Sequence, residues 1–76
     1  MTYETSKADL EKIEKAFTYH APQGDQPSRY VSIRDNAKEL AIQMTQYAPP
    51  SRELSLALTN LEQAVMWCNA AIARNE

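Results

Sequence analysis

The sequence predicts an all-α protein in which a short N-terminal helix precedes a long antiparallel αα-hairpin. Residues 51–76 contain neither Gly nor Pro, and their apolar residues recur at steps of three and four, the period of one helix face. A second stretch of this kind ends just before the pair Pro49-Pro50. Two long helices joined by so short a connection lie antiparallel.

The N-terminal helix is expected over Ser6–Phe17. Ser6 and Asp9 have the spacing of a helix N-cap and its N3 partner. An isolated helix of this length is marginal in water, so we expect it to dock on a longer element. Its apolar side consists of Leu10, Ile13, Ala16 and Phe17.

The second helix is expected to begin between Asp25 and Ser28 and to end near Tyr47. The preceding residues, 18–28, hold the only Gly and two of the four prolines, and this turn chemistry indicates a loop. Either Asp25 or Gln26 is a candidate cap, with Pro27 tolerated in the first turn. The apolar residues of this helix repeat in heptad fashion at Tyr30, Ile33, Ala37, Leu40, Ala41, Met44 and Tyr47.

The third helix is expected over Ser51–Glu76, with Ser51 as its N-cap. At about 1.5 Å per residue it reaches about 39 Å, so we expect it to extend beyond the second helix. Cys68 lies on its apolar stripe and is expected to be a small buried residue. The whole stripe consists of Leu54, Ala57, Leu58, Leu61, Ala64, Val65, Cys68, Ala71 and Ile72.

Apolar surface exceeds what one hairpin can cover. We expect a single domain over residues 1–76, and a domain of this size buries only about 60% of the surface that its unfolded chain exposes. Leu56, Met66 and Trp67 lie off the stripe of the third helix and add to its apolar surface. One cysteine cannot form an internal disulfide. We therefore expect a symmetric homo-oligomer.

The composition excludes several classes of function. The net charge of −2 argues against binding DNA through a broad basic face. The polar N-terminus is neither a signal peptide nor a membrane span, and an unpaired cysteine suits a reducing cytoplasm. One histidine and one cysteine do not make a metal site, and neither a cofactor motif nor a nucleophile with its base is apparent. We therefore expect no metal, no cofactor and no enzymatic activity.

Aromatic and cationic residues gather around the loop and the helix that follows it. Tyr19 and His20 lie in the loop, and Arg34 and Lys38 share one face of the helix because they are four residues apart. Aromatic rings stack on bases, and Arg or Lys pairs with phosphates, so this combination favours a nucleotide ligand. The alternative is a solvated helix surface with no ligand. Arg29 and Tyr30 belong to the same cluster.

Several segments resemble a family of small phage proteins that sequester cyclic oligonucleotides and so block the bacterial CBASS defence. The same hairpin resembles part of the phage anti-Thoeris sponge. The resemblance covers nearly the whole chain, and its most specific parts are Tyr-His-x-Pro, Tyr-x-x-Ile-Arg and Met-Trp-x-Asn-Ala-Ala-Ile-Ala-Arg. The segments that carry it are FTYHAP (17–22), RYVSIRDNAKELA (29–41), PPSREL (49–54) and LEQAVMWCNAAIARN (61–75).

The resemblance implies a hexamer, in the cytoplasm of the infected host, that binds cyclic dinucleotides such as cyclic GMP-AMP without cleaving them. Some members also bind cyclic trinucleotides at separate pockets. By position in the motifs, Tyr19 would stack on a base and Arg34 would neutralise phosphate in the dinucleotide pocket. His20 and Lys38 are further candidate ligand-binding residues. The family often has Lys where Arg34 stands. Arg74 is the candidate for the trinucleotide pocket, although some relatives continue with a tail that completes it.

A different class of function remains open on the residues alone. A structural or adaptor oligomer that binds a protein partner would have the same helices and the same apolar surplus. Tyr19 and Arg34 discriminate between the two hypotheses, because an adaptor has no need for an aromatic ring and a cation that converge across a subunit boundary.

Overall fold

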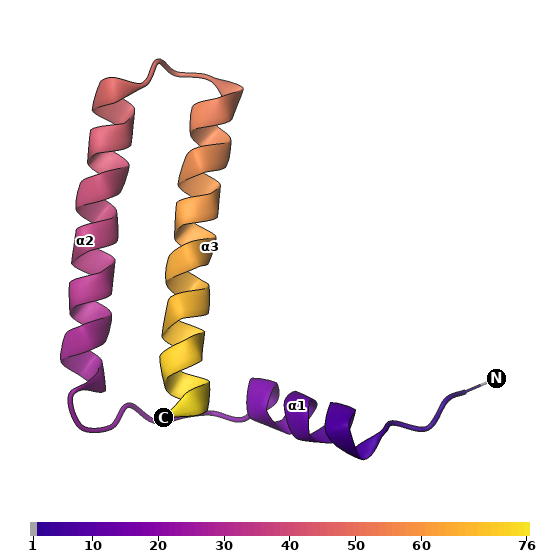
Figure 1. Cartoon of the computed structure of the whole chain (residues 1–76). Helices are drawn as coiled ribbons and strands as arrows, with labels where there is room; N and C mark the ends of the chain where they lie inside the picture. Colours follow the sequence, from indigo (N-terminus) through magenta and orange to yellow (C-terminus); the bar gives the residue numbers. More distant parts are fainter. Residues whose placement is uncertain (1) are drawn as a thin grey trace.

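Three helices follow one another along the chain: α1 (Lys7–Phe17), α2 (Gln26–Tyr47) and α3 (Arg52–Asn75). The computed structural model describes residues 2–76, and no strand occurs among them. α2 and α3 run antiparallel, and α1 projects sideways from the base of this hairpin, so that the chain has the outline of a letter L (Figure 1). The prediction of an all-α chain with a helical hairpin is confirmed.

The predicted caps explain why two of the helices begin where they do. The Ser6 Oγ accepts a hydrogen bond of 3.1 Å from the backbone N–H of Asp9, and the Ser51 Oγ accepts one of 3.1 Å from Leu54. Each hydroxyl satisfies one of the N–H groups that have no partner inside the helix. Between α2 and α3, Ala48 is already extended, as expected for a residue before proline.

The start of α2 is not capped by a Ser hydroxyl. Gly24 has a φ of +55°, a conformation that favours glycine, and it turns the chain into the helix. Asp25 stands at the N-cap position but makes no side-chain cap bond. Instead the Gln26 Oε1 accepts a hydrogen bond of 3.0 Å from the backbone N–H of Gln23. Gln26 is 6% exposed, and it is the only buried residue between positions 2 and 76.

α1 does not dock on the hairpin, which contradicts the expectation from its length. Leu10 and Ile13 are about half exposed, and Phe17 is 85% exposed. One polar contact tethers the helix: the Lys15 Nζ donates a hydrogen bond of 2.7 Å to the Asn75 Oδ1. The apolar side of α1 is therefore uncovered in the single chain.

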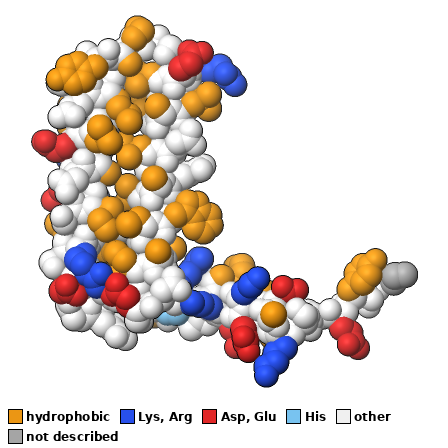
Figure 2. All heavy atoms as spheres, in the orientation of Figure 1, with side chains coloured by type: hydrophobic (Ala, Val, Ile, Leu, Met, Phe, Trp, Pro, Cys, Tyr) orange, Lys and Arg blue, Asp and Glu red, His pale blue; other side chains and the backbone are white. Residues whose placement is uncertain are grey.

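α2 and α3 meet along a seam of half-buried side chains, with no fully buried hydrophobic residue in the described chain. Figure 2 shows hydrophobic side chains along the hairpin, and charged ones at its base, on α1 and near the turn between α2 and α3. Leu40 and Tyr47, placed on the packed face by periodicity, are exposed, and so is Cys68. The seam residues are Ile33, Ala37, Ala41 and Met44 on α2 and Leu54, Ala57, Leu58, Leu61, Val65 and Ile72 on α3.

The chain is too open for a compact monomer of its size. Its accessible surface is 6450 Å², whereas a compact monomer of 8.6 kDa exposes about 4,700 Å². Its radius of gyration is 17.1 Å, whereas about 11 Å is typical of a compact domain of this length. Much of the excess is apolar, since Met66 and Trp67 on α3 are about two-thirds exposed.

Candidate ligand-binding site

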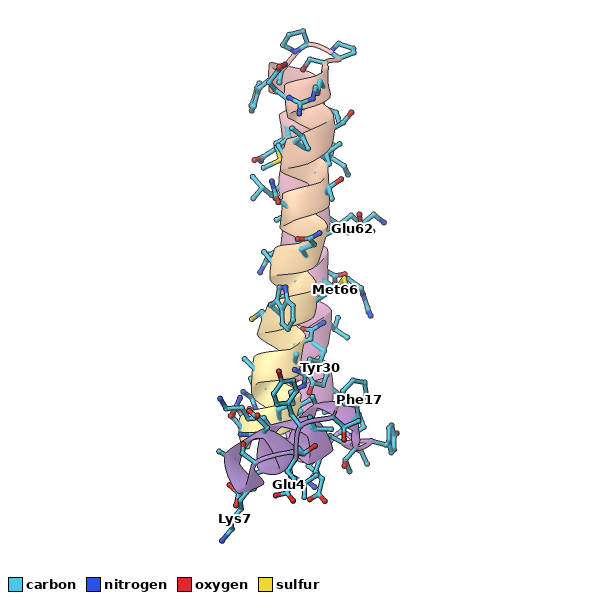
Figure 3. The ribbon with its side chains drawn as sticks, turned by 90° about the vertical axis from the view of Figure 1, so that its right-hand side faces the viewer. Glu4, Lys7, Phe17, Tyr30, Glu62 and Met66 are labelled. Atoms are coloured by element: carbon cyan, nitrogen blue, oxygen red, sulfur yellow. The ribbon has the colours of Figure 1, made fainter. Side chains whose placement is uncertain are left out.

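One hollow lies at the base of the hairpin, where α1, the loop after it, α2 and α3 meet. This basal hollow has a volume of about 530 Å³ and is wide open to solvent. Tyr30 stands near the level at which α1 crosses the hairpin (Figure 3). The hollow is lined by Ala16, Thr18, Tyr19, His20, Tyr30, Asn69, Ala70, Ala73 and Arg74.

The loop after α1 positions Tyr19 and His20 at the rim of the basal hollow. The His20 Nε2 lies 2.9 Å from the backbone carbonyl oxygen of Lys15. A carbonyl oxygen only accepts hydrogen bonds, so this ring nitrogen carries the proton and donates. The preceding residue, Thr18, donates through its Oγ1 to the carbonyl oxygen of Glu14 at the end of α1. Between these anchored neighbours the Tyr19 ring is 83% exposed and is available to a ligand.

A clamp of polar side chains joins the end of α3 to the start of α2. The Arg29 Nη1 donates a hydrogen bond of 2.8 Å to the Glu76 Oε2, and the Arg29 Nη2 contacts the Glu76 Oε1 at 2.5 Å. The Gln26 Nε2 donates to the same Oε1 at 3.2 Å, and Asp25 lies 3.1 Å from the Arg29 Nη2. This clamp contradicts the expectation that α3 extends beyond α2, because the two ends meet.

The hydrogen bonds from Arg29, followed by the one from Gln26, lower the pKa of Glu76 from an ordinary 4.5 to about 2. The same contact with Glu76 raises the pKa of Arg29 above its usual range. Both groups therefore stay charged near neutral pH. The clamp holds together the first turns of α2 and the last turns of α3. These turns carry Tyr30 and Arg74, which line the basal hollow.

A second hollow lies halfway along the seam between α2 and α3. This seam hollow, of about 410 Å³, has an apolar floor with charged side chains around it. Arg34 and Lys38 come from α2, and Glu62 comes from α3 on the opposite side. No ion pair involves Arg34 or Lys38 within residues 2–76. The seam hollow is lined by Arg34, Ala37, Lys38, Ala41, Leu58, Leu61, Glu62, Val65 and Met66.

The five predicted site residues fall into two groups. Tyr19, His20 and Arg74 line the basal hollow, whereas Arg34 and Lys38 line the seam hollow. Tyr19 and Arg34, which were predicted to hold one ligand, do not share a hollow within a single chain. Each of these residues still sits where a ligand can reach it.

Asn69 is a polar lining residue that the sequence analysis missed, as are Thr18 in the basal hollow and Glu62 in the seam hollow. Asn69 lies in the basal hollow on α3, one helix turn and a residue before Arg74. A polar residue between Cys68 and Ala70 interrupts the apolar run, and the same asparagine stands inside the motif Met-Trp-x-Asn. Either feature could have drawn attention to it. By contrast, Tyr30 already belonged to the cluster of aromatic and cationic residues.

A third hollow, near the turn between α2 and α3, offers no cation. Its charged residue is Glu53, and its other lining residues are apolar or neutral. Among residues 2–76, no three or more His, Cys, Asp or Glu side chains are grouped so as to hold a metal ion. Over the same residues, no helix combines the length and the apolar character needed to cross a membrane.

An open helical hairpin that carries cations and aromatic rings in shallow hollows has the features of a small ligand-binding protein. Comparison with known families assigns the chain to a particular family. The family described as Acb2/Tad1, hairpin domain, matches residues 9–73, and the chain belongs to this family. No curated protein and no solved structure matches the chain. Membership implies a sponge-type anti-defence role, and the family is a binding domain rather than a known enzyme family.

Proposed function

We propose that the protein binds and sequesters cyclic oligonucleotide second messengers without cleaving them, and so prevents activation of CBASS effectors in the infected cell. The observation that carries the proposal is the family match over residues 9–73, which includes all of the seam hollow and every lining residue of the basal hollow except Arg74. The ligands are cyclic dinucleotides such as cyclic GMP-AMP, and also cyclic trinucleotides. The site of action is the host cytoplasm.

The chemistry of the two hollows supports this ligand class. Arg34 and Lys38 are cations without ion-pair partners in residues 2–76, and phosphates are their natural partners. Tyr19 offers an exposed ring on which a base can stack. A cyclic dinucleotide has two phosphates and approximate two-fold symmetry, so Arg34 from each of two chains matches it. Tyr19 of one chain then meets Arg34 of the other, which accounts for their separation within one chain.

Assembly into a hexamer of one domain per chain is part of the proposal. The surface excess over a compact monomer and the exposed Leu56, Met66 and Trp67 support contact between chains. The uncovered apolar side of α1 is a further surface for such a contact. Symmetric assembly would duplicate each hollow and add a wall from a neighbouring chain.

Titration calorimetry with cyclic GMP-AMP and with cyclic triadenylate tests the proposal. We expect saturable binding at micromolar protein, and we expect the ligand released by heating, after long incubation, to be recovered chemically intact. Absence of binding to both ligand classes would contradict the proposal. Cleaved ligand would contradict sequestration without chemistry.

The exposed apolar surface also favours a second candidate, an adaptor oligomer that binds a protein partner through Met66 and Trp67. The two candidate functions predict different amounts of nucleotide bound to the purified protein. A sponge expressed in cells that make cyclic dinucleotides should release nucleotide on heating, and an adaptor should release none.

A further inference from the structure

Asn69 carries a buried oxygen atom that has no hydrogen-bond partner. Its Oδ1 is enclosed, and no donor within residues 2–76 reaches it. The other enclosed polar side-chain atom without a partner in this range is the Arg29 Nε. That case has a local explanation, because the remaining guanidinium nitrogens of Arg29 already hold Glu76 and Asp25. Asn69 has no comparable set of bonds.

An enclosed amide oxygen without a partner destabilises the folded chain, and such atoms are rare in native proteins. Asparagine is also a poorer helix former than leucine or alanine, and Asn69 stands inside α3. Both effects oppose Asn69 in the free chain. Its side chain must therefore gain its partner in another state of the molecule.

The surroundings of Asn69 indicate what that partner is. It shares the basal hollow with the rings of Tyr19 and Tyr30 and with the guanidinium of Arg74. In the proposed arrangement the rings stack on a base and the guanidinium of Arg74 holds a phosphate, so the edge of the base is left to another group. A carboxamide presents a donor beside an acceptor, which matches the amino group and ring nitrogen on the edge of adenine.

We propose that Asn69 is a specificity-determining residue of the basal hollow, where its carboxamide accepts a hydrogen bond from the amino group of a base whose phosphate is held by Arg74. This inference rests on the proposed function and adds the group that reads the ligand. The Oδ1 is enclosed in the free chain and has no hydrogen-bond partner there. The terminal torsion of asparagine is soft, so the carboxamide turns as the base enters.

The test compares Asn69→Leu with Asn60→Leu. Asn60 lies on the same helix, is exposed and lines none of the three hollows, so its replacement brings the same change in helix propensity. Relative to this control, we expect Asn69→Leu to raise Tm by about 4 °C, because an unpaired buried acceptor is removed. A side chain with a purely structural role would move Tm in the opposite direction.

Calorimetry of the same variants measures recognition, with cyclic triadenylate and cyclic GMP-AMP as probes. For the ligand whose affinity falls in Arg74→Ala, we expect Asn69→Leu to weaken binding roughly tenfold. Asn60→Leu should bind like the wild type. Replacing adenine by hypoxanthine, which lacks the amino group, should weaken binding to the wild type but not to Asn69→Leu.

Three outcomes overturn the inference. A Tm for Asn69→Leu below that of Asn60→Leu would show that the oxygen is partnered in the folded protein. Unchanged affinity for both ligands would show that Asn69 does not touch them. The third outcome concerns a ligand that lacks the ribose 2′-hydroxyl. If removing this hydroxyl weakens binding to the wild type but not to Asn69→Leu, the hydrogen-bond donor is the ribose hydroxyl and not the amino group of the base. Failure of the wild type to bind either ligand would instead contradict the proposed function itself.

Discussion

The clamp at the base of the hairpin and the seam hollow differ in how their charged groups are held. At the base, Arg29, Gln26 and Glu76 hold one another in a clamp that links α2 to α3. In the seam, Arg34 and Lys38 stand over an apolar floor with no ion pair among residues 2–76. Charges that satisfy each other within the chain stabilise the fold, and charges without a partner are available to a ligand. The comparison therefore favours a structural role for Arg29 and supports the proposal that Arg34 binds ligand.

Loss of a free cation should have the largest effect. We expect Arg34→Ala to weaken cyclic dinucleotide binding by roughly 100-fold, because each ligand would lose a charge-assisted contact from two chains. Calorimetry with cyclic GMP-AMP measures the change. Arg52→Ala is the matched control, since Arg52 is exposed on α3 and lines none of the three hollows. If Arg34→Ala binds like the wild type while remaining assembled, the seam hollow is not the dinucleotide site.

Arg74→Ala should have a smaller and more selective effect. We expect it to weaken cyclic trinucleotide binding by roughly tenfold and to leave cyclic dinucleotide binding unchanged, because it removes one guanidinium from the basal hollow. Parallel titrations with cyclic triadenylate and cyclic GMP-AMP separate the two ligands. Loss of both, together with a change in molar mass by light scattering, would indicate broken assembly and remove the distinction between the hollows.

The clamp should give the smallest effect, and one on stability rather than on binding. The pKa of Glu76 is about 2 in the folded chain and 4.5 ordinarily, so its contribution is complete above about pH 4.5 and is lost as the pH falls through 2. We expect Glu76→Gln to lower Tm slightly at pH 6 and to match the wild type at pH 2. Thermal unfolding at both pH values measures this. Glu39→Gln, an exposed change on α2, should show no such convergence; equal behaviour of the two variants would refute the clamp.

Local signals in the sequence predicted the helices well. Ser6 and Ser51 are caps whose hydrogen bonds form within three residues, and Pro49 acts on the residue before it. The site residues were harder to group, because whether Tyr19 and Arg34 share a hollow depends on how distant segments meet. The docking of α1 and the burial of Cys68 were predicted wrongly for the same reason, since periodicity shows which face is apolar but not what covers it. The orphan oxygen of Asn69 is visible only in three dimensions.

The absence of any fully buried hydrophobic side chain in residues 2–76 has a consequence for how the protein behaves in solution. The Cα atoms occupy a slab of 50 × 40 × 13 Å, which is about one helix thick. In the proposed assembly, such a slab encloses its apolar side chains against another chain, and folding then follows mass action. We expect the melting temperature to rise with protein concentration, so that dilution alone destabilises the fold. A bound messenger that bridges two chains should oppose this effect of dilution.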